Sequence, residues 1–266
     1  MAAFDPRAYW DGRHAKHYGP ESVGYAGLGV SYNVWMYRVR NHVVCREIRR
    51  ARVQMSRCDV LDVGSGTGFY VDLWGRLGAK SVTGSDFAPY AVAALRKQFP
   101  SHSFCELDIT AADLPGALGQ FDVVSAFDIL YHIVDDGKYA QAFRNVSALI
   151  RPRGFFVFSE NFLPGGRESS AHQVSRSSEE IARLLSENGF EILRRAPVFF
   201  LMNRPLKSRS RVLSATWNVI ERVTSKHDRP YLANWLGAAL YPIEISTLKW
   251  MSTGPTTEMM ICRRRL

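Results

Sequence analysis

From residue 57 onward, short apolar runs alternate with longer segments of helical periodicity. Five runs rich in β-forming residues, each bounded by turn residues, lie at 58–63, 80–85, 102–107, 121–127 and 154–160. Their near-continuous apolar character is typical of strands covered on both faces of a sheet. Between them, segments such as 135–150 carry apolar side chains at helical spacing. The alternation predicts a doubly wound α/β protein with a parallel sheet and with ligands at the carboxyl ends of its strands.

Other segments flank this region. Residues 33–50 place apolar side chains on one face and arginines on the other, as a docking helix would. Five large aromatic residues interrupt the alternation late in the chain. We predict four parts: an N-terminal helical lid or cap at 1–56, a core at 57–202, a helical insertion at 203–255 and a final core strand at 256–266.

The composition is that of a globular protein with a basic surface. The chain has 266 residues, is 46% hydrophobic and carries a formal net charge of +9. This excess of positive charge raises the expectation of nucleic acid, anionic lipid or an acidic substrate as a partner. Clusters of arginine on a solvated surface are sufficient to explain it, and we prefer that interpretation.

Cysteine usage and the terminal segments bear on the compartment. The four cysteines are scattered and form no paired metal motif, which fits a reducing cytosol. The N-terminus lacks the basic start and apolar core of a signal peptide. The most apolar late stretch is interrupted by Asn234, Pro242 and Glu244, so it makes a poor membrane span. We therefore expect a cytoplasmic protein without membrane insertion.

A glycine-rich loop, DVGSGTG at 62–68, follows the first predicted strand. A Walker loop would end in Gly-Lys-Ser/Thr, but Gly68 is followed by Phe69 and Tyr70, which argues against nucleoside triphosphates. The dinucleotide fingerprint GxGxxG also fits poorly, because the third glycine comes one residue early.

Three acidic residues give the loop a more specific meaning. Asp62 stands just before the first glycine, where a buried carboxylate suits a positively charged ligand better than a pyrophosphate. Asp86 ends the next strand, where a carboxylate can accept from both ribose hydroxyls. Asp108 ends the third strand and can accept from an adenine amino group, with Ile109 packing on the ring. Singly, each has a plain structural interpretation as a cap or turn residue.

Four motifs in order, VLDVGSGTG, VTGSDFAP, ELDIT and FDVVSAFDILYHI, resemble those of class I S-adenosylmethionine-dependent methyltransferases. The resemblance covers residues 58–192 and implies a Rossmann-like, seven-stranded sheet whose last strand runs antiparallel. It also implies S-adenosyl-L-methionine as the cofactor.

The resemblance carries donor-binding roles to matching positions. The glycines would face the methionine part of the donor with support from Asp62, Asp86 would hold the ribose, and Phe87 would lie near the adenine face. Asp108 and Ile109 would meet the adenine edge, and Phe127 resembles the position whose carbonyl receives the donor's ammonium group. The full predicted set is Asp62, Gly64, Ser65, Gly66, Gly68, Asp86, Phe87, Asp108, Ile109 and Phe127.

Candidate catalytic residues follow the fourth and fifth strands. His132 is our candidate general base, with Tyr131 lining the acceptor pocket and Asp128 nearby. A helix cap or packing role for His132 is an equal alternative. Glu160 and Asn161 are candidate acceptor contacts. With Asp128 they faintly resemble the ligands of metal-dependent catechol-type methyltransferases, but no third carboxylate is evident and we predict no metal.

Outside the core, Tyr9, Tyr18 and Arg38 are candidate contacts to the acceptor or to the donor's carboxylate. A closing N-terminal lid would exclude water from the site. Residues 203–255 would shape the acceptor pocket, although a homodimer contact or a subsidiary core is equally compatible with their aromatics.

The leading hypothesis is methyl transfer to a small-molecule acceptor, at oxygen, by in-line displacement. The alternatives are an RNA or other nucleic-acid methyltransferase, suggested by the charge, and a family member that binds the donor without transferring a methyl group. The Asn/Asp-Pro-Pro-aromatic motif of adenine-N6 enzymes is replaced here by AFDILYH. We therefore expect a small molecule rather than nucleic acid as the partner.

Overall fold

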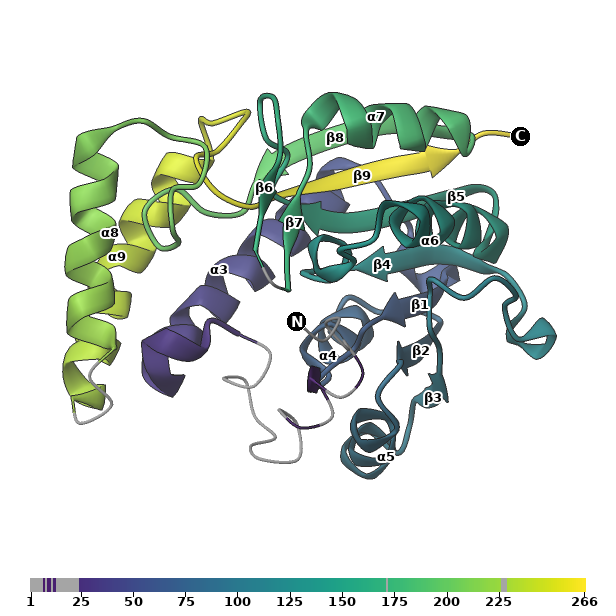
Figure 1. Ribbon diagram of the computed structural model, residues 1–266. Coiled ribbons are helices and arrows are strands. Elements are labelled where there is room, and N and C mark those ends of the chain that lie inside the picture. Colours follow the sequence, from purple (N-terminus) through teal and green to yellow (C-terminus); the bar gives the residue numbers. More distant parts are fainter. Residues whose placement is uncertain (1–6, 8, 11, 13–23, 171, 226–228) are drawn as a thin grey trace. The chain divides into compact units, whose positions relative to one another are not determined.

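A seven-stranded sheet forms the centre of the computed structural model, which describes residues 7, 9, 10, 12, 24–170, 172–225 and 229–266 (Figure 1). Its spatial order is β3-β2-β1-β4-β5-β9-β8. The strands are β1 (Asp59–Val63), β2 (Ser81–Asp86), β3 (Ser103–Glu106), β4 (Phe121–Ala126), β5 (Ile150–Glu160), β8 (Phe190–Pro197) and β9 (Glu258–Arg264). A separate two-stranded antiparallel pair joins β6 (Glu168–Ser169) to β7 (Val174–Ser175).

The first five strands are parallel, and the last strand of the chain, β9, runs against them. Figure 1 shows β9 pointing opposite to β4 and β8. The predicted fold class is therefore confirmed, including the antiparallel last strand.

The described chain also forms helices in both of its parts. They are α3 (Gly29–Arg50), α4 (Phe69–Arg76), α5 (Pro89–Gln98), α6 (Asp136–Leu149), α7 (Ser178–Glu187), α8 (Arg211–Thr224) and α9 (Pro230–Leu248). The short 3-10 helices are η1 (Ala26–Leu28), η2 (Met55–Arg57), η3 (Gly116–Leu118) and η4 (Leu130–His132). Side-chain caps start three of the helices: Asp135 for α6, Ser177 for α7 and Ser210 for α8 each accept a backbone N–H from the first turn.

The strand order fixes where a ligand can bind. β1 pairs with β2 on one side and with β4 on the other, so the order reverses between β1 and β4. In register, Asp62 of β1 lies opposite Gly84 and Ser125. In open α/β sheets the carboxyl ends of the strands at such a reversal form the ligand crevice. The loops after β1, β2 and β4 therefore meet at this edge.

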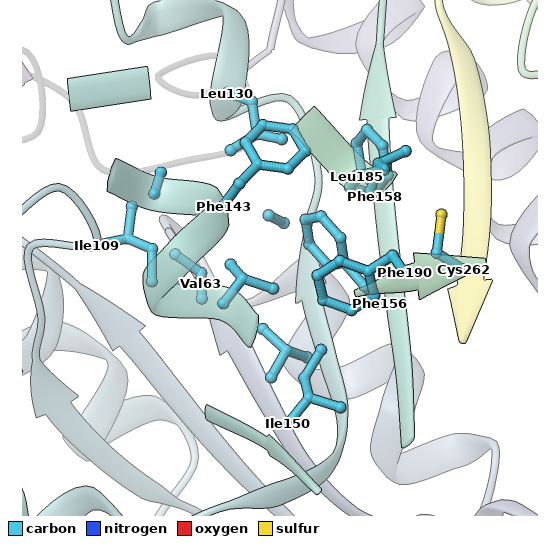
Figure 2. Packing of buried hydrophobic residues seen from close by; sticks show 14 of the residues in the cluster. Val63, Ile109, Leu130, Phe143, Ile150, Phe156, Phe158, Leu185, Phe190 and Cys262 are labelled. Carbon is cyan, nitrogen blue, oxygen red and sulfur yellow. The ribbon is translucent and has the colours of Figure 1, made fainter. Parts of the chain in front are cut away.

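An aromatic and aliphatic core supports one face of the sheet (Figure 2). Phe156 and Phe158 of β5 stack with ring centroids 4.5 Å apart, and Phe143 of α6 meets both rings edge-on. Figure 2 shows Phe190 and Cys262 beside them, which ties β8 and β9 into the same core. This burial anchors β4 and β5, and with them the loops that follow.

The chain divides into two compact units. We call the first the sheet unit (Met1–Lys16, Ala51–Arg194 and Met260–Leu266) and the second the helical unit (His17–Arg50 and Arg195–Met259). The division groups α3 with α8 and α9, whereas the sequence placed residues 1–56 together as one lid. The four predicted domain ranges stay predictions.

Within the helical unit, α3 packs along α9. Trp35 of α3 donates from Nε1 to Asn234 Oδ1 over 2.8 Å, and its ring lies against Gly237, where a β-carbon would come within 2.3 Å of it.

Among the described residues, no helix is long and apolar enough to cross a membrane.

Candidate active site

The glycine loop between β1 and α4 has a backbone that only glycine adopts easily. Gly64, Gly66 and Gly68 have φ values of +69°, +53° and +86°. A β-carbon at Gly64 would lie 2.2 Å from Cδ1 of Ile129. The loop is fastened to β2, because the Ser65 N–H donates to the Ser85 carbonyl over 2.8 Å. The sequence therefore shapes a tight bend close to the residues that follow β4.

Asp62 is buried beneath this bend. Its two carboxylate oxygens accept from Ser125 Oγ over 2.6 Å and from Ser65 Oγ over 2.9 Å. Burial raises the pKa of Asp62 to about 6, although both hydroxyl hydrogen bonds act to lower it. A cationic group bound beside it would favour the ionised form, which is the response expected of a carboxylate that recognises a positively charged ligand.

Asp86 closes the other side of the loop. Its Oδ2 accepts the Gly66 N–H and its Oδ1 accepts the Ala88 N–H, both over 3.0 Å. The carboxylate is buried and fixed at the end of β2. The structure thus brings together Asp62, Asp86 and the glycine bend, as the sequence predicts.

The three residues predicted around the adenine differ in placement. Phe87 follows Asp86 and is half-buried. Asp108 is exposed, and its Oδ1 accepts from the N–H and the hydroxyl of Thr110 in a local turn. Ile109 is buried in the hydrophobic core (Figure 2) and its carbonyl accepts from Asn145. Their predicted roles toward adenine stay predictions.

Phe127, directly after β4, is buried under an aromatic stack. Its ring is parallel to that of Tyr70 in α4, with centroids 4.1 Å apart. The ring is thereby held in place, and the predicted donor contact of this position concerns its backbone carbonyl.

Asp128 adopts a left-handed conformation with a φ of +58°. Its N–H donates to Ser159 Oγ over 2.7 Å, and the same hydroxyl donates back to Asp128 Oδ1 over 3.0 Å. Such conformations cost energy in residues other than glycine and cluster at functional sites. This clamp links the loop after β4 to the end of β5.

His132 lies in a cluster of rings drawn from three parts of the sheet unit. Its Nδ1 is 3.1 Å from the carbonyl oxygen of His172. Ring centroids separate His132 from Tyr131 by 4.7 Å and from Trp10 by 5.0 Å, and Tyr9 stacks on His172 at 5.6 Å. Because a carbonyl only accepts, Nδ1 carries a proton in this contact, and Nε2 becomes the acceptor nitrogen of a neutral ring.

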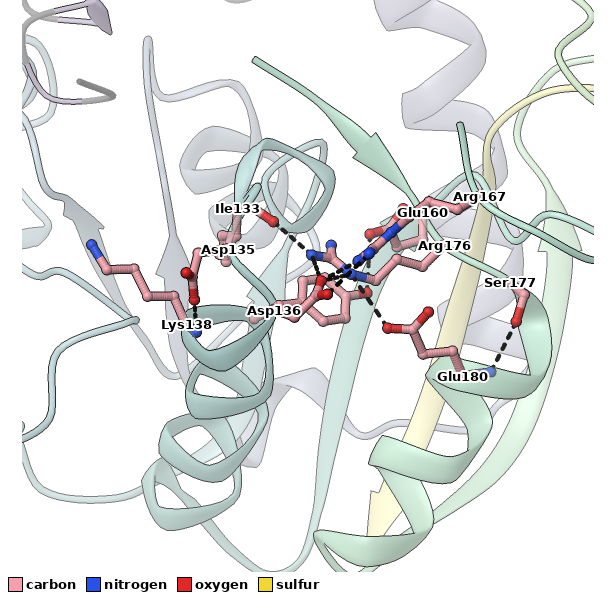
Figure 3. A network of polar contacts seen from close by, with 10 residues as sticks. Ile133, Asp135, Asp136, Lys138, Glu160, Arg167, Arg176, Ser177 and Glu180 are labelled. Carbon is pink, nitrogen blue, oxygen red and sulfur yellow. Dashed lines mark hydrogen bonds and ion pairs between the residues drawn. The ribbon is translucent and has the colours of Figure 1, made fainter. Parts of the chain in front are cut away.

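Glu160, at the end of β5, is fully buried in a polar network (Figure 3). It accepts from the Tyr139 hydroxyl over 3.1 Å and from the Asn161 N–H over 2.9 Å. Burial raises the pKa of Glu160 to about 7. Asn161 is also buried, and its amide donates to Ser175 Oγ over 2.7 Å.

Arg176 organises the same network without being exposed. Its guanidinium lies 3.6 Å over the Tyr139 ring, and it donates to Asp136 over 2.8 Å and to the Ile133 carbonyl over 3.0 Å. Figure 3 shows it between β5 and the first turns of α6 and α7. These contacts hold the ends of three elements together beside Glu160.

Two further predicted acceptor contacts stay predictions. Tyr18 lies outside the described residues. Arg38 belongs to the helical unit, where its guanidinium lies 4.2 Å over the ring of Trp35. No group of three or more histidine, cysteine, aspartate or glutamate residues able to hold a metal ion occurs among the residues that the structure describes.

Sequence reasoning missed the partners that fix the predicted residues. Ser125 Oγ donates to Asp62 and accepts from the buried Trp74 Nε1 over 2.9 Å. A serine inside a continuously apolar strand was the available signal, since a buried hydroxyl requires partners. The sequence offered no signal for the contact of Arg176 with Asp136 or for that of the His172 carbonyl with His132, because each joins residues about 40 positions apart.

These residues fit S-adenosylmethionine. The observations that support this fit are the buried carboxylate of Asp62, the fixed carboxylate of Asp86 and three left-handed glycines, of which Gly64 and Gly68 leave no room for a β-carbon. A parallel sheet with this loop at its switch point defines a Rossmann-like nucleoside-binding class.

Comparisons with known proteins indicate which nucleoside-binding proteins this chain resembles. Residues 60–154 match the family described as "Methyltransferase domain". A ubiquinone biosynthesis O-methyltransferase of Albidiferax ferrireducens is 38% identical over 141 residues, which are 47% of this chain and 53% of the relative. The match therefore spans about half of that relative's length.

Solved structures agree at the level of the fold. Magnesium protoporphyrin IX methyltransferase from Synechocystis PCC 6803, solved with bound S-adenosylmethionine, has a TM-score of 0.58 at 16% identity, with 99% of both chains covered. The cyclase SpnF has a TM-score of 0.55 at 20% identity, covering 85% of this chain and 81% of its own. Residues 60–154 therefore match a methyltransferase domain, and the comparisons together support a class I S-adenosylmethionine-dependent methyltransferase.

Proposed function

We propose that the protein transfers the methyl group of S-adenosylmethionine to a hydroxyl oxygen of a small molecule, with His132 as general base. The observation that carries the proposal is the pair of buried carboxylates at the glycine bend, Asp62 and Asp86. The family's cofactor and the O-methyltransferase name of the Albidiferax relative support it.

On the donor side, this chain binds and orients. The glycine loop and Ser65 would face the methionine part, with Asp62 beneath them. Asp86 would accept from the ribose hydroxyls, with Phe87 near the adenine face and Asp108 and Ile109 at its edge. The bound donor supplies an electrophilic methyl group on a cationic sulfur. Because the reaction disperses charge, positioning and exclusion of water are the main contributions required of the protein.

On the acceptor side, a hydroxyl group must lose its proton as the new bond to oxygen forms. The His172 carbonyl holds His132 in the tautomer whose Nε2 can take that proton. The rings of Trp10 and Tyr131 beside His132, with Tyr9 stacked on His172, favour a flat, aromatic acceptor.

Other residues would position the acceptor rather than move protons. Asp128 is held by Ser159, and Glu160 and Asn161 are held by Tyr139 and Ser175. Asp128 follows β4, Glu160 is the last residue of β5 and Asn161 comes directly after it. We assign Asp128 to shaping the pocket beside His132, and Glu160 and Asn161 to supporting its wall.

The test is incubation of the whole chain with S-adenosylmethionine labelled in the methyl group and a panel of hydroxylated aromatic compounds, amines and total RNA. We expect label in an aromatic methyl ether, identified by mass spectrometry. Label in amines would contradict transfer at oxygen, and label in RNA would contradict the small-molecule acceptor.

A second candidate is donor binding without methyl transfer. This candidate is supported by the likeness in fold to SpnF, whose title describes a cyclase and not a methyltransferase. Tight binding of S-adenosylhomocysteine, together with no label in any acceptor of the panel, would favour this candidate.

A further inference from the structure

One face of α9 exposes large apolar side chains. Tyr231 is 80% exposed, Trp235 73% and Ile243 51%, and Trp250, just beyond the helix, is 90% exposed. At about 100° per residue these positions fall within roughly one third of the helix circumference. They form one continuous stripe, completed by Leu232, Ala239, Pro242 and Ser246, which are also exposed.

The stripe carries no charge along the whole helix. Glu244 is the one charged residue between Pro230 and Leu248, and it points inward. It is fully buried and accepts the N–H groups of Phe200 and Leu201 over 2.6 and 2.8 Å. A helix of this composition is usually covered on all sides, so an exposed uncharged face calls for a partner.

The helical unit that contains this uncharged face is strongly positive. The helical unit contains 14 lysines and arginines against six aspartates and glutamates, a formal charge of +8 out of the chain's +9. Its described carboxylates turn away from solvent: Glu47, Glu244 and Glu258 are buried, and Glu221 accepts from the Tyr25 hydroxyl.

Cations also lie at the two ends of the stripe. Arg229 is exposed at the start of α9. At the other end, Arg46 of α3 donates to the Leu248 carbonyl over 3.2 Å, next to the exposed Lys249. The pKa of His42 is lowered by burial and by the nearby Arg46, Lys249 and Arg49, so positive charge also gathers around His42 of α3.

We propose that this face of α9, with its flanking cations, docks on the surface of an anionic lipid bilayer. Tryptophan and tyrosine side chains favour the boundary between headgroups and acyl chains, and each nearby cation gains from the negative surface potential. A helix that lies in this plane buries its apolar face and keeps its cations among the headgroups.

The charge distribution favours lipid over the other occupants. A second copy docked through the same face would bring together two helical units that each have a formal charge of +8, which costs energy. Nucleic acid requires cations along the contact itself, whereas the centre of this stripe has none. An anionic bilayer offers both an apolar layer and a negative plane.

The test is sedimentation of the whole chain with vesicles of phosphatidylcholine alone or mixed with phosphatidylglycerol. We expect binding to the mixed vesicles, weaker binding to the neutral ones, and loss of binding as salt rises. The double variant Trp235→Ser/Trp250→Ser should bind the mixed vesicles about tenfold more weakly or worse. The matched control Tyr90→Ser removes an exposed aromatic from α5 in the sheet unit and should bind like the parent.

Titration with S-adenosylhomocysteine shows whether each variant keeps a folded donor site, so the result does not depend on methyl transfer. Equal binding to neutral and anionic vesicles, no binding, or an equal loss in Tyr90→Ser would overturn the proposal. A dimer of the parent protein in sedimentation equilibrium that the double variant abolishes would also overturn the proposal. The same holds for binding of RNA by the parent protein that the double variant abolishes.

Discussion

The backbone N–H of Gly66 donates to Oδ2 of Asp86 over 3.0 Å, across twenty positions of sequence. This bond joins the glycine loop after β1, predicted to face the methionine part of the donor, to the end of β2, predicted to hold its ribose. Because Oδ1 of Asp86 accepts from Ala88, the carboxylate has a fixed orientation at the edge of the sheet.

Replacing Ser125 with alanine should destabilise the protein. The change leaves the buried Trp74 Nε1 without its acceptor and removes one hydrogen bond to Asp62. An unsatisfied buried donor costs about 1–3 kcal/mol. Urea denaturation measures it, with Ser81→Ala as the control, because the exposed Ser81 bonds Asp59 at the surface. Equal effects in both variants would contradict a special role for the Ser125 bridge.

Gly64→Ala should cost more than Gly78→Ala. Both glycines have a left-handed φ, +69° and +81°, so both substitutions carry a backbone cost of about 1–2 kcal/mol. The new methyl group at position 64 would meet Ile129, whereas a β-carbon at position 78 would have nothing within 4 Å. The difference in the free energy of unfolding between the two variants isolates the packing contribution.

Adding Ile129→Ala to Gly64→Ala should recover that difference, after correction for Ile129→Ala alone. If the effects of Gly64→Ala and Ile129→Ala on the free energy of unfolding prove additive, the contact between residues 64 and 129 does not cause the extra loss of stability in Gly64→Ala.

Glu160→Gln should reduce the pH dependence of stability. The folded protein holds the proton of Glu160 up to a pKa of about 7, against the ordinary 4.5, so folding is favoured below pH 4.5 and this advantage is lost as pH rises through 7. Glutamine resembles the protonated acid, accepting from the Asn161 N–H and donating to the Tyr139 hydroxyl.

We therefore expect wild type to lose more stability than Glu160→Gln between pH 5 and pH 8, measured by denaturant midpoints at each pH. Glu187→Gln, at an exposed salt bridge with Arg183, serves as the control and should follow wild type. Parallel curves for wild type and Glu160→Gln would show that Glu160 ionises normally.

His132→Gln should lower kcat by about 10²–10⁴-fold and leave the affinity for S-adenosylhomocysteine unchanged, because a base acts on the acceptor and not on the donor. His172→Gln is the matched control, since its backbone carbonyl, which contacts His132, is retained. An unchanged kcat in His132→Gln would show that His132 is not the base. A loss of affinity for S-adenosylhomocysteine in this variant would show that His132 has a structural role.

The sheet was predictable because its determinants are local. Apolar runs predicted β1, β4 and β5, and the spacing of Asp62 and Asp86 placed both at strand ends that the parallel topology brings together. Contacts between distant segments were not predictable. The bridge from Ser125 to Trp74 spans 51 positions, and each residue alone suits an apolar element.

The helical unit shows the same limit. The pattern of residues 33–50 predicted a helix, and they lie in α3. The packing of α3 against α9 joins segments about 200 positions apart. The interruption of 230–248 by Glu244 argued against a membrane span, but only the structure shows that this carboxylate is buried and the opposite face exposed. Which side of such a helix faces solvent is decided by its tertiary neighbours.

Calorimetric titration with S-adenosylhomocysteine and with NADH, on wild type and on Asp86→Ala, tests the central claim most directly. We predict binding of the sulfur nucleoside alone, and a loss of about tenfold or more in affinity in Asp86→Ala, with Asp72→Ala on the exposed face of α4 behaving like wild type. Wild type that ignores S-adenosylhomocysteine, or an Asp86→Ala variant that binds it as tightly as wild type does, would contradict the account.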